Sequence, residues 1–322
     1  MIRRSETVPS GSPLAPVTTA SVLPASDVAE VVRSQADVET SRLVSTMGTV
    51  HYLAWAIPAI GFGTYPLKGE EGIAAMTSAL EVGYRLLDTA VNYENEAEVG
   101  RAVRESAVPR AEILVQTKVP GRFHARDLAI RSVEDSLRRM HLDVLDLVLV
   151  HWPNPSQGRY VEVVEALLTC RERGLVRSVG VSNYTERLLD EVIEATGFTP
   201  SVNQIELHPS FPQAELVARH ESLGIRTQAW SPLARMESEG DGDDPLTRIA
   251  AAHGISPAQA VLAWHVARGI VPLPKSADPA RQVANLAALE ITLTPDEVAA
   301  ITALGRPDGR LFDGDPETHE ED

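Results

Sequence analysis

The chain has 322 residues, of which 43% are hydrophobic and 23% are charged, a balance typical of globular proteins. Its formal net charge of −16 argues against nucleic acid or an anionic membrane as a partner, because their phosphates would be repelled. No apolar run approaches about eighteen residues, which excludes a membrane-spanning helix. The single cysteine, Cys170, excludes an internal disulfide and fits a reducing, cytoplasmic location, and its helical context predicts packing rather than catalysis.

The first part of the chain, residues 1–46, differs from the rest. It is rich in Ser, Pro, Thr, Val and Ala without a hydrophobic period, so we predict that it is disordered. No apolar segment follows the pair Arg3-Arg4, so we predict no export signal, and Met47 is an alternative start. We assign 47–322 to one domain. Its acidic end is predicted to be a solvated tail, and folding of this tail over a pocket rim stays open.

Between the two ends, short β-branched runs that finish in a polar residue alternate with amphipathic helical stretches. The stretch 127–140 illustrates the helical pattern, with apolar residues at Leu128, Val133, Leu137 and Met140. The runs predict eight strands, at 60–64, 84–89, 113–118, 145–151, 177–183, 201–206, 225–231 and 270–275.

Helix-starting signals agree with this division of the chain. Ser256 and Asp278 each precede a proline, which places a capping side chain before a proline at the first helical position. Thr294 with Glu297 has the spacing of a capping box. Three late helices are therefore predicted to begin at these residues.

Alternating strands and helices over this length predict an α/β fold, a single-domain (β/α)8 TIM barrel. A doubly wound open sheet is the alternative. Its dinucleotide site would require Gly-x-Gly-x-x-Gly directly after the first strand. Gly61 and Gly63 are followed by Thr64-Tyr65-Pro66 without a third glycine, which favours the barrel.

In such a barrel the C-terminal strand ends form the active-site face. Tyr93 follows the second predicted strand by a few residues, on the loop after it. Polar or aromatic side chains occupy the predicted strand ends themselves: Thr64, Tyr65, Asp88, Lys118, His151, Ser182, Asn183, Gln204, Trp230, Ser231 and Lys275. A complete ring of such residues is difficult to explain by structure alone, so we predict a site here.

Several motifs occur at these strand ends in order: GFGT at 61–64, LLDTAVNYENEAEVG at 86–100, TK at 117–118, HWP at 151–153, GVSNY at 180–184, NQIE at 203–206, WSPL at 230–233 and PKSADPARQVANL at 274–286. With these motifs the chain resembles the aldo-keto reductases over about residues 56–315. The short acidic loop at 234–245 and the modest C-terminal tail are similar to the bacterial branch that includes diketogluconate reductases.

The resemblance implies four catalytic residues: Asp88, Tyr93, Lys118 and His151. A free tyrosine, with a pKa of about 10, is a weak acid for protonating an alkoxide at neutral pH. A lysine ammonium beside Tyr93 should lower its pKa, and Asp88 should hold that lysine in place. His151 should orient the carbonyl of the substrate. NADPH would supply the hydride, with NADP+ as the product.

The resemblance also implies a cofactor site. Ser182, Asn183 and Gln204 match residues that hold the nicotinamide carboxamide, and Trp230 matches the aromatic residue that stacks on its ring. Further positions match the rest of NADPH: Gly63, Thr64 and Asp88 near the nicotinamide, Ser231 and Leu233 at the pyrophosphate, Lys275, Ser276 and Arg281 at the 2′-phosphate, and Asn285 at the adenine. Ala284 departs from the glutamate or glutamine that many relatives carry there.

The substrate is expected to be a small aldehyde, ketone or dicarbonyl, in a pocket lined by Tyr65, Tyr93, His151 and Trp152. We predict no metal site and a monomer. Two other functions stay open: a non-catalytic module that binds NADPH as a redox sensor, and an isomerase or aldolase whose phosphate site would use Lys275 and Arg281.

Overall fold

A computed structural model describes residues 57–234, 244–312 and 314–321. The predicted disordered segment, residues 1–46, lies outside this range, as does most of the short loop at 234–245. None of the described helices is long and apolar enough to cross a membrane.

The centre of the molecule is one sheet of eight parallel strands whose order in space is their order in the chain. The backbone N–H groups of Gly61 and Gly63 donate to the carbonyls of Pro272 and Pro274, so the last strand pairs with the first and the sheet closes. The predicted (β/α)8 barrel is confirmed. Its strands are β1 (Phe62–Gly63), β2 (Leu86–Asp88), β3 (Leu114–Val119), β4 (Leu145–Val150), β5 (Val176–Ser182), β6 (Val202–Glu206), β7 (Arg226–Trp230) and β8 (Val271–Pro272).

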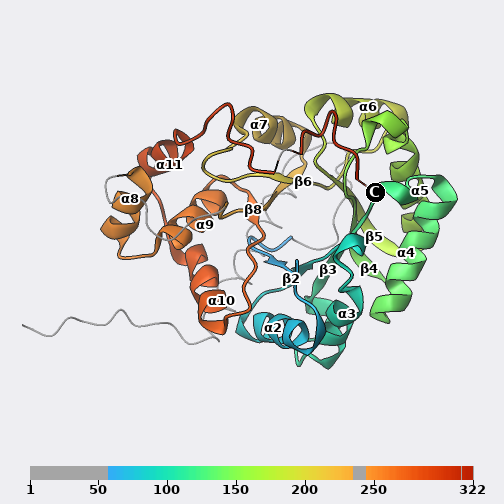
Figure 1. Cartoon of the computed structure of the whole chain (residues 1–322), viewed down its shortest axis with the longest axis horizontal. Helices are drawn as coiled ribbons and strands as arrows, with labels where there is room; N and C mark the ends of the chain where they lie inside the picture. The colour runs from blue at the N-terminus through green and yellow to red at the C-terminus, as the bar shows by residue number, and fades with distance from the viewer. Residues whose placement is uncertain (1–56, 235–243, 313, 322) are drawn as a thin grey trace, which may run out of the picture.

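Helices surround this barrel on the outside (Figure 1). The chain beyond the last helix runs back across the barrel in this view (Figure 1) and ends near the loop after β4, where Asn154 donates to the carbonyl of Glu321. The helices are α2 (Gly69–Val82), α3 (Glu96–Glu105), α4 (Arg126–Met140), α5 (Tyr160–Glu172), α6 (Glu186–Thr196), α7 (Ala214–Leu223), α8 (Pro245–His253), α9 (Pro257–Ala267), α10 (Pro279–Leu286) and α11 (Pro295–Thr302). Short 3-10 turns are η1 (Val91–Tyr93), η2 (Arg110–Glu112), η3 (Gly121–Phe123), η4 (Pro155–Gln157) and η5 (Ala287–Glu290).

The three predicted helix starts are confirmed. Ser256 caps α9 and Thr294 caps α11, each in a capping box with the side chain three residues later. Asp278 accepts a hydrogen bond from the backbone N–H of Ala280 and caps α10. Each cap satisfies amide groups that the first helical turn leaves without a partner.

Two apolar layers hold the barrel together. Alternate strand residues point inward, so that Leu147 and Leu149 join a cluster inside the barrel, whereas Val148 and Val150 pack outward under the helices. Cys170 is fully buried in the outer layer, as predicted. Of the four apolar residues predicted to face inward from α4, Val133, Leu137 and Met140 are buried, whereas Leu128 is exposed and Ala129 is buried beside it.

The contact between α3 and α4 generates a stability prediction. A Cβ atom on Gly100 would lie 2.1 Å from the carbonyl oxygen of Met140. Gly100→Ala should therefore lower the free energy of unfolding by about 1–3 kcal/mol through overpacking, although alanine by itself favours a helix. Urea denaturation of this variant and of Glu105→Ala, an exposed position on the same helix, would test it. A more stable Gly100→Ala variant would contradict the tight contact.

Candidate active site

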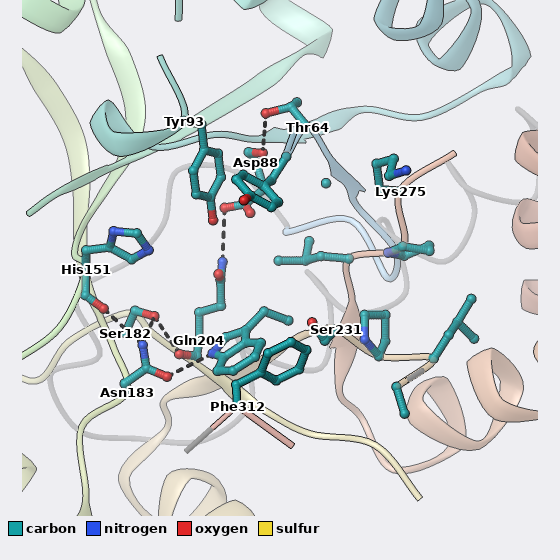
Figure 2. Close-up of a pocket in the computed structure, with 18 of the residues that line it drawn as sticks. Thr64, Asp88, Tyr93, His151, Ser182, Asn183, Gln204, Ser231, Lys275 and Phe312 are labelled. Atoms are coloured by element: carbon teal, nitrogen blue, oxygen red, sulfur yellow. Dashed lines mark hydrogen bonds between the residues drawn. The ribbon is translucent and has the colours of Figure 1, made fainter. Parts of the chain in front are cut away.

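A cavity of about 520 Å³ opens at the C-terminal ends of the strands. Figure 2 shows that side chains from strands far apart in the chain converge on it. Most of the predicted site residues line this cavity: Gly63, Thr64, Tyr65, Asp88, Tyr93, His151, Trp152, Ser182, Asn183, Gln204, Trp230, Ser231, Leu233 and Lys275. The barrel therefore brings the predicted strand-end residues together, as the parallel arrangement requires.

A buried ion pair lies at the bottom of the site. The Lys118 ammonium contacts the Asp88 carboxylate, with Nζ 2.9 Å from Oδ2, and the lysine side chain is fully buried. Lys118 also donates to the hydroxyl of Tyr93 at 3.1 Å and to the carbonyl of Thr89 at 3.0 Å. All three donor positions of the ammonium are used, which fixes the place of the tyrosine hydroxyl.

Three glutamines surround Asp88, and two of them were not predicted. Gln116 and Gln204 both donate to its Oδ1, at 2.5 and 3.0 Å, and both also donate to Gln228. Gln204, predicted to meet the nicotinamide carboxamide, thus also supports the buried carboxylate. Gln116 and Gln228 occupy inward positions on β3 and β7, where a polar residue in a buried strand is the only signal that the sequence offers.

Burial changes the acidity of Tyr93 in the opposite sense to the prediction. Burial raises the pKa of Tyr93 above its ordinary value, the Lys118 ammonium opposes this rise, and Asp88 adds to it. The prediction of a lowered pKa was wrong because it counted the neighbouring charge and not the loss of water. Burial also works against the Lys118 ammonium, but Asp88 and Tyr93 outweigh it, so the pKa of Lys118 is raised. The site therefore holds a neutral phenol beside a charged ammonium.

Aromatic rings form the wall beside Tyr93. The ring of Tyr65 lies 5.1 Å from that of Tyr93, and the ring of His151 packs edge-on against Tyr93 at 5.9 Å. Trp152 faces Trp230 at 6.4 Å. These residues line the cavity on the side of Tyr93, where the substrate pocket was predicted.

A second group of polar side chains lies opposite the ion pair. Asn183 donates through Nδ2 to the carbonyl of His151 at 3.0 Å, and its Oδ1 accepts from the indole N–H of Trp230 at 2.8 Å. Ser182 donates to the carbonyl of Gln204 at 2.8 Å. These bonds connect the ends of β4, β5, β6 and β7 (Figure 2) and hold the Trp230 ring at the edge of the cavity.

The remaining predicted cofactor residues lie on the β8 side. Lys275 lines the cavity, whereas Ser276, Arg281 and Asn285 follow it on the next turn and on α10 and do not line it. The Arg281 side chain is 79% exposed and lies 3.5 Å from Asp278, so its guanidinium is available to a ligand. Ser276 and Asn285 are buried.

The C-terminal tail folds over the rim of this site, one of the two possibilities that the sequence left open. Phe312 lines the cavity and packs 5.3 Å from Trp230, and His319 packs 4.1 Å from Trp152. Glu321 contacts His151, with its Oε1 2.7 Å from Nδ1. Neither Phe312 nor Glu321 was predicted, because no strand-end position marks them.

Comparison with known proteins identifies the family. Residues 59–306 match the model of the aldo/keto reductase family. The chain belongs to this family. It is 57% identical over 261 residues to 2,5-diketo-D-gluconic acid reductase B of Corynebacterium sp. (strain SHS752001), covering 81% of this chain and 93% of that protein. It is 39% identical over 262 residues to Methylglyoxal reductase DkgA of Salmonella typhimurium (strain LT2), covering 81% and 94% of the two chains.

A similar protein has been solved with NADPH bound. The crystal structure of a mutant of Gox0644 in complex with NADPH superposes with a TM-score of 0.77 at 38% identity, covering 82% of this chain and 95% of that one. The predicted resemblance and enzyme class, an oxidoreductase of the aldo-keto reductase type, are confirmed. NADPH, the predicted cofactor, is bound in this structure of a relative.

The buried pair generates a test of the site. Lys118→Met leaves the Asp88 carboxylate buried without its cation, so we expect a loss of about 3–5 kcal/mol in the free energy of unfolding. The double variant Asp88→Asn with Lys118→Met should regain much of that stability but no activity. Chemical denaturation would measure both, with Lys68→Met as the control for an exposed pair worth about 1 kcal/mol or less. Equal losses for Lys68→Met and Lys118→Met would contradict this account.

Proposed function

We propose that this protein reduces aldehydes or ketones to alcohols with NADPH, and that Tyr93 is the general acid. The observation that carries the proposal is the 3.1 Å hydrogen bond from the Lys118 ammonium to the Tyr93 hydroxyl, at the bottom of a cavity that His151 also lines. A proton donor, a cation that stabilises its conjugate base and a group that can orient a carbonyl are the parts that carbonyl reduction requires.

Each residue of the site has a role in the proton transfer. Tyr93 donates its hydroxyl proton to the carbonyl oxygen, and the fixed Lys118 ammonium stabilises the phenolate that forms. Asp88 keeps Lys118 in place and charged, and His151 orients the carbonyl through its ring. NADPH, when bound, supplies the hydride to the carbonyl carbon. The raised pKa keeps the proton on the Tyr93 hydroxyl before the substrate binds, and it also makes the phenol a weaker acid, so the transfer depends on the Lys118 ammonium, which opposes the rise.

The residues around the cavity fit the chemistry of NADPH. Amide and hydroxyl groups of Ser182, Asn183 and Gln204 suit a carboxamide, and Trp230 presents an aromatic surface at the same edge. Ser231 and Leu233 would meet the pyrophosphate. Lys275 and the exposed Arg281, beside the N-terminus of α10, form a basic site for the 2′-phosphate in a protein of strongly negative net charge.

The aromatic wall suits small carbonyl compounds, and two of the relatives are named for the reduction of dicarbonyl compounds. We propose aldehydes, ketones and dicarbonyls of this size as substrates of a cytoplasmic monomer. A redox sensor without catalysis needs no proton donor, and the bonded arrangement of Asp88, Lys118 and Tyr93 favours the enzyme. An isomerase or aldolase would require a phosphorylated substrate in place of NADPH. Consumption of NADPH with a panel of carbonyl compounds distinguishes these functions.

Tyr93→Phe tests the role of the proton donor. The variant keeps the ring, and therefore the packing, but has no proton to give, so turnover should fall by about 10²–10⁴-fold while NADPH affinity stays unchanged. Steady-state kinetics and a fluorescence titration with NADPH measure the two quantities. Tyr160→Phe, which removes a hydroxyl outside the site, is the control. Turnover within about three-fold of the parent would mean that another group donates the proton.

Arg281→Ala tests the cofactor preference. NADPH differs from NADH by the 2′-phosphate alone, and a charge-assisted hydrogen bond to it is worth about 1.5–3 kcal/mol. The variant should therefore bind NADPH about one to two orders of magnitude more weakly and NADH almost unchanged, as measured by quenching of tryptophan fluorescence. Arg306→Ala, the control, removes another exposed guanidinium that lies outside the site. Equal weakening for both cofactors would contradict the assignment.

A further inference from the structure

The carboxylate of Glu321 lies between the two parts of the site that act on the carbonyl. Its Oε1 is 2.7 Å from Nδ1 of His151, which directly follows β4, and 2.7 Å from Nδ2 of Asn92, which precedes Tyr93 on η1. The contact with His151 is that of an ion pair without the full alignment of a hydrogen bond. Both Glu321 and His151 have side chains that are only 12% exposed. The carboxylate of Glu321 thus connects η1, which carries Tyr93, to His151.

The tail that carries Glu321 is fastened along its length. The backbone N–H of Leu311 donates to Glu206 at 2.7 Å, and Glu317 accepts from Thr185 and Arg187 on the start of α6. At the far end, Asn154 donates to the backbone carbonyl of Glu321. The carboxylate is therefore carried by a segment that is held at Leu311 and Glu321 through its backbone and at Glu317 through its side chain.

Two glycines allow the C-terminal tail to pack closely against the rest of the molecule. A Cβ atom on Gly121 would lie 2.3 Å from the carbonyl oxygen of Glu321 and 2.2 Å from Nδ2 of Asn154. A Cβ atom on Gly314 would lie 2.6 Å from the ring of Trp152. At both positions a neighbouring group lies too close for a larger residue, so both require glycine. Both contacts hold the C-terminal tail against the rest of the molecule.

From this arrangement we infer that Glu321 is a positioning residue for the reduction, which holds His151 so that its other ring nitrogen, Nε2, is presented to the substrate carbonyl. The inference rests on the proposed function of His151 and Tyr93. A carboxylate oxygen 2.7 Å from Nδ1 favours a proton on that nitrogen, because an unprotonated Nδ1 would place two lone pairs against each other. Nε2 is then the nitrogen that remains for the substrate.

Beyond the effect of burial, Glu321 and Asp88 raise the pKa of Tyr93, whereas the Lys118 ammonium opposes them. Glu321 and Glu320 also lie near His124, whose burial lowers its pKa to about 4, so that it is neutral near pH 7. Removing the Glu321 charge should therefore lower the pKa of Tyr93, which would lose its proton at a lower pH.

Three variants separate positioning from general structure. Glu321→Ala removes the acceptor and the charge, and should lower kcat about ten-fold with little change in NADPH affinity. Glu321→Gln keeps an acceptor oxygen without the charge, and should restore most of kcat. Glu320→Gln, which removes a charge from the adjacent residue that bonds to the backbone of Ser156, should behave as the parent. All are measured with methylglyoxal or the carbonyl that the parent reduces fastest.

The pH dependence of kcat distinguishes the two roles, because a variant that only loosened the packing would leave it unchanged. In Glu321→Ala and Glu321→Gln the basic limb of kcat should shift to lower pH, and in Glu320→Gln it should not. Gly121→Ala, which displaces the tail, should reproduce the loss in Glu321→Ala, and the double variant should add nothing further. A Glu321→Ala variant with the kcat and the pH profile of Glu320→Gln would overturn the inference.

A measurement without turnover keeps this test apart from that of the proposed function. In ¹⁵N NMR spectra the His151 ring, identified by its loss in His151→Gln, should carry its proton on Nδ1 in the parent and redistribute it in Glu321→Ala. Unchanged ring resonances would overturn the role of Glu321, whatever the activity. A parent that consumes no NADPH with any carbonyl would count against the proposed function alone.

Discussion

The buried ion pair of Lys118 and Asp88 is the constraint on which the site depends. Two charges removed from water are tolerated only when further hydrogen bonds satisfy them, since desolvation costs several kcal/mol for each ion. Here Asp88 accepts from Gln116 and Gln204, and Lys118 donates to Tyr93 as well as to Asp88. The requirement to satisfy this pair draws strands β2, β3 and β6 and the Tyr93 turn to one point. The place of the Tyr93 hydroxyl follows from it.

The sequence predicted the barrel and most of the site because parallel strands all end at the same face. Asp88, Lys118 and His151 could be placed together without coordinates, since each stands at or directly after a β-branched run. The residue Gln228 could not be placed, because a polar residue inside a buried strand does not reveal its partner. The direction of the Tyr93 pKa also needed the structure, because it depends on how much water the folded chain excludes.

The tail lay beyond prediction for a different reason. Glu321 and His151 are far apart in the sequence, although their side chains are in contact. No periodicity or motif in the acidic end of the chain indicates which surface it contacts. The signals that exist are indirect. Gly121 and Gly314 are required by close approach, but a sequence shows a glycine without showing what approaches it. The composition alone favoured a solvated tail. In the structure the acidic side chains instead contact Arg187, His151 and the backbone N–H of Ser156.

The two halves of the site are held by different parts of the chain. On the cofactor side, the buried Gln282 donates to the carbonyls of Ala75 and Ser276, which fastens α10 to α2 and to the loop after β8. Arg281, which we propose for the 2′-phosphate, lies on α10 and is therefore positioned by these contacts. On the substrate side, the wall of Trp152 and His151 is completed by the returning tail. Glu321 at the far end of the tail contacts His151 and Asn92, whereas Phe312 packs against Trp230, the residue proposed to meet the nicotinamide. Changes at Glu321 should therefore act on the proposed reduction with little effect on cofactor affinity, whereas changes at Phe312 should affect both.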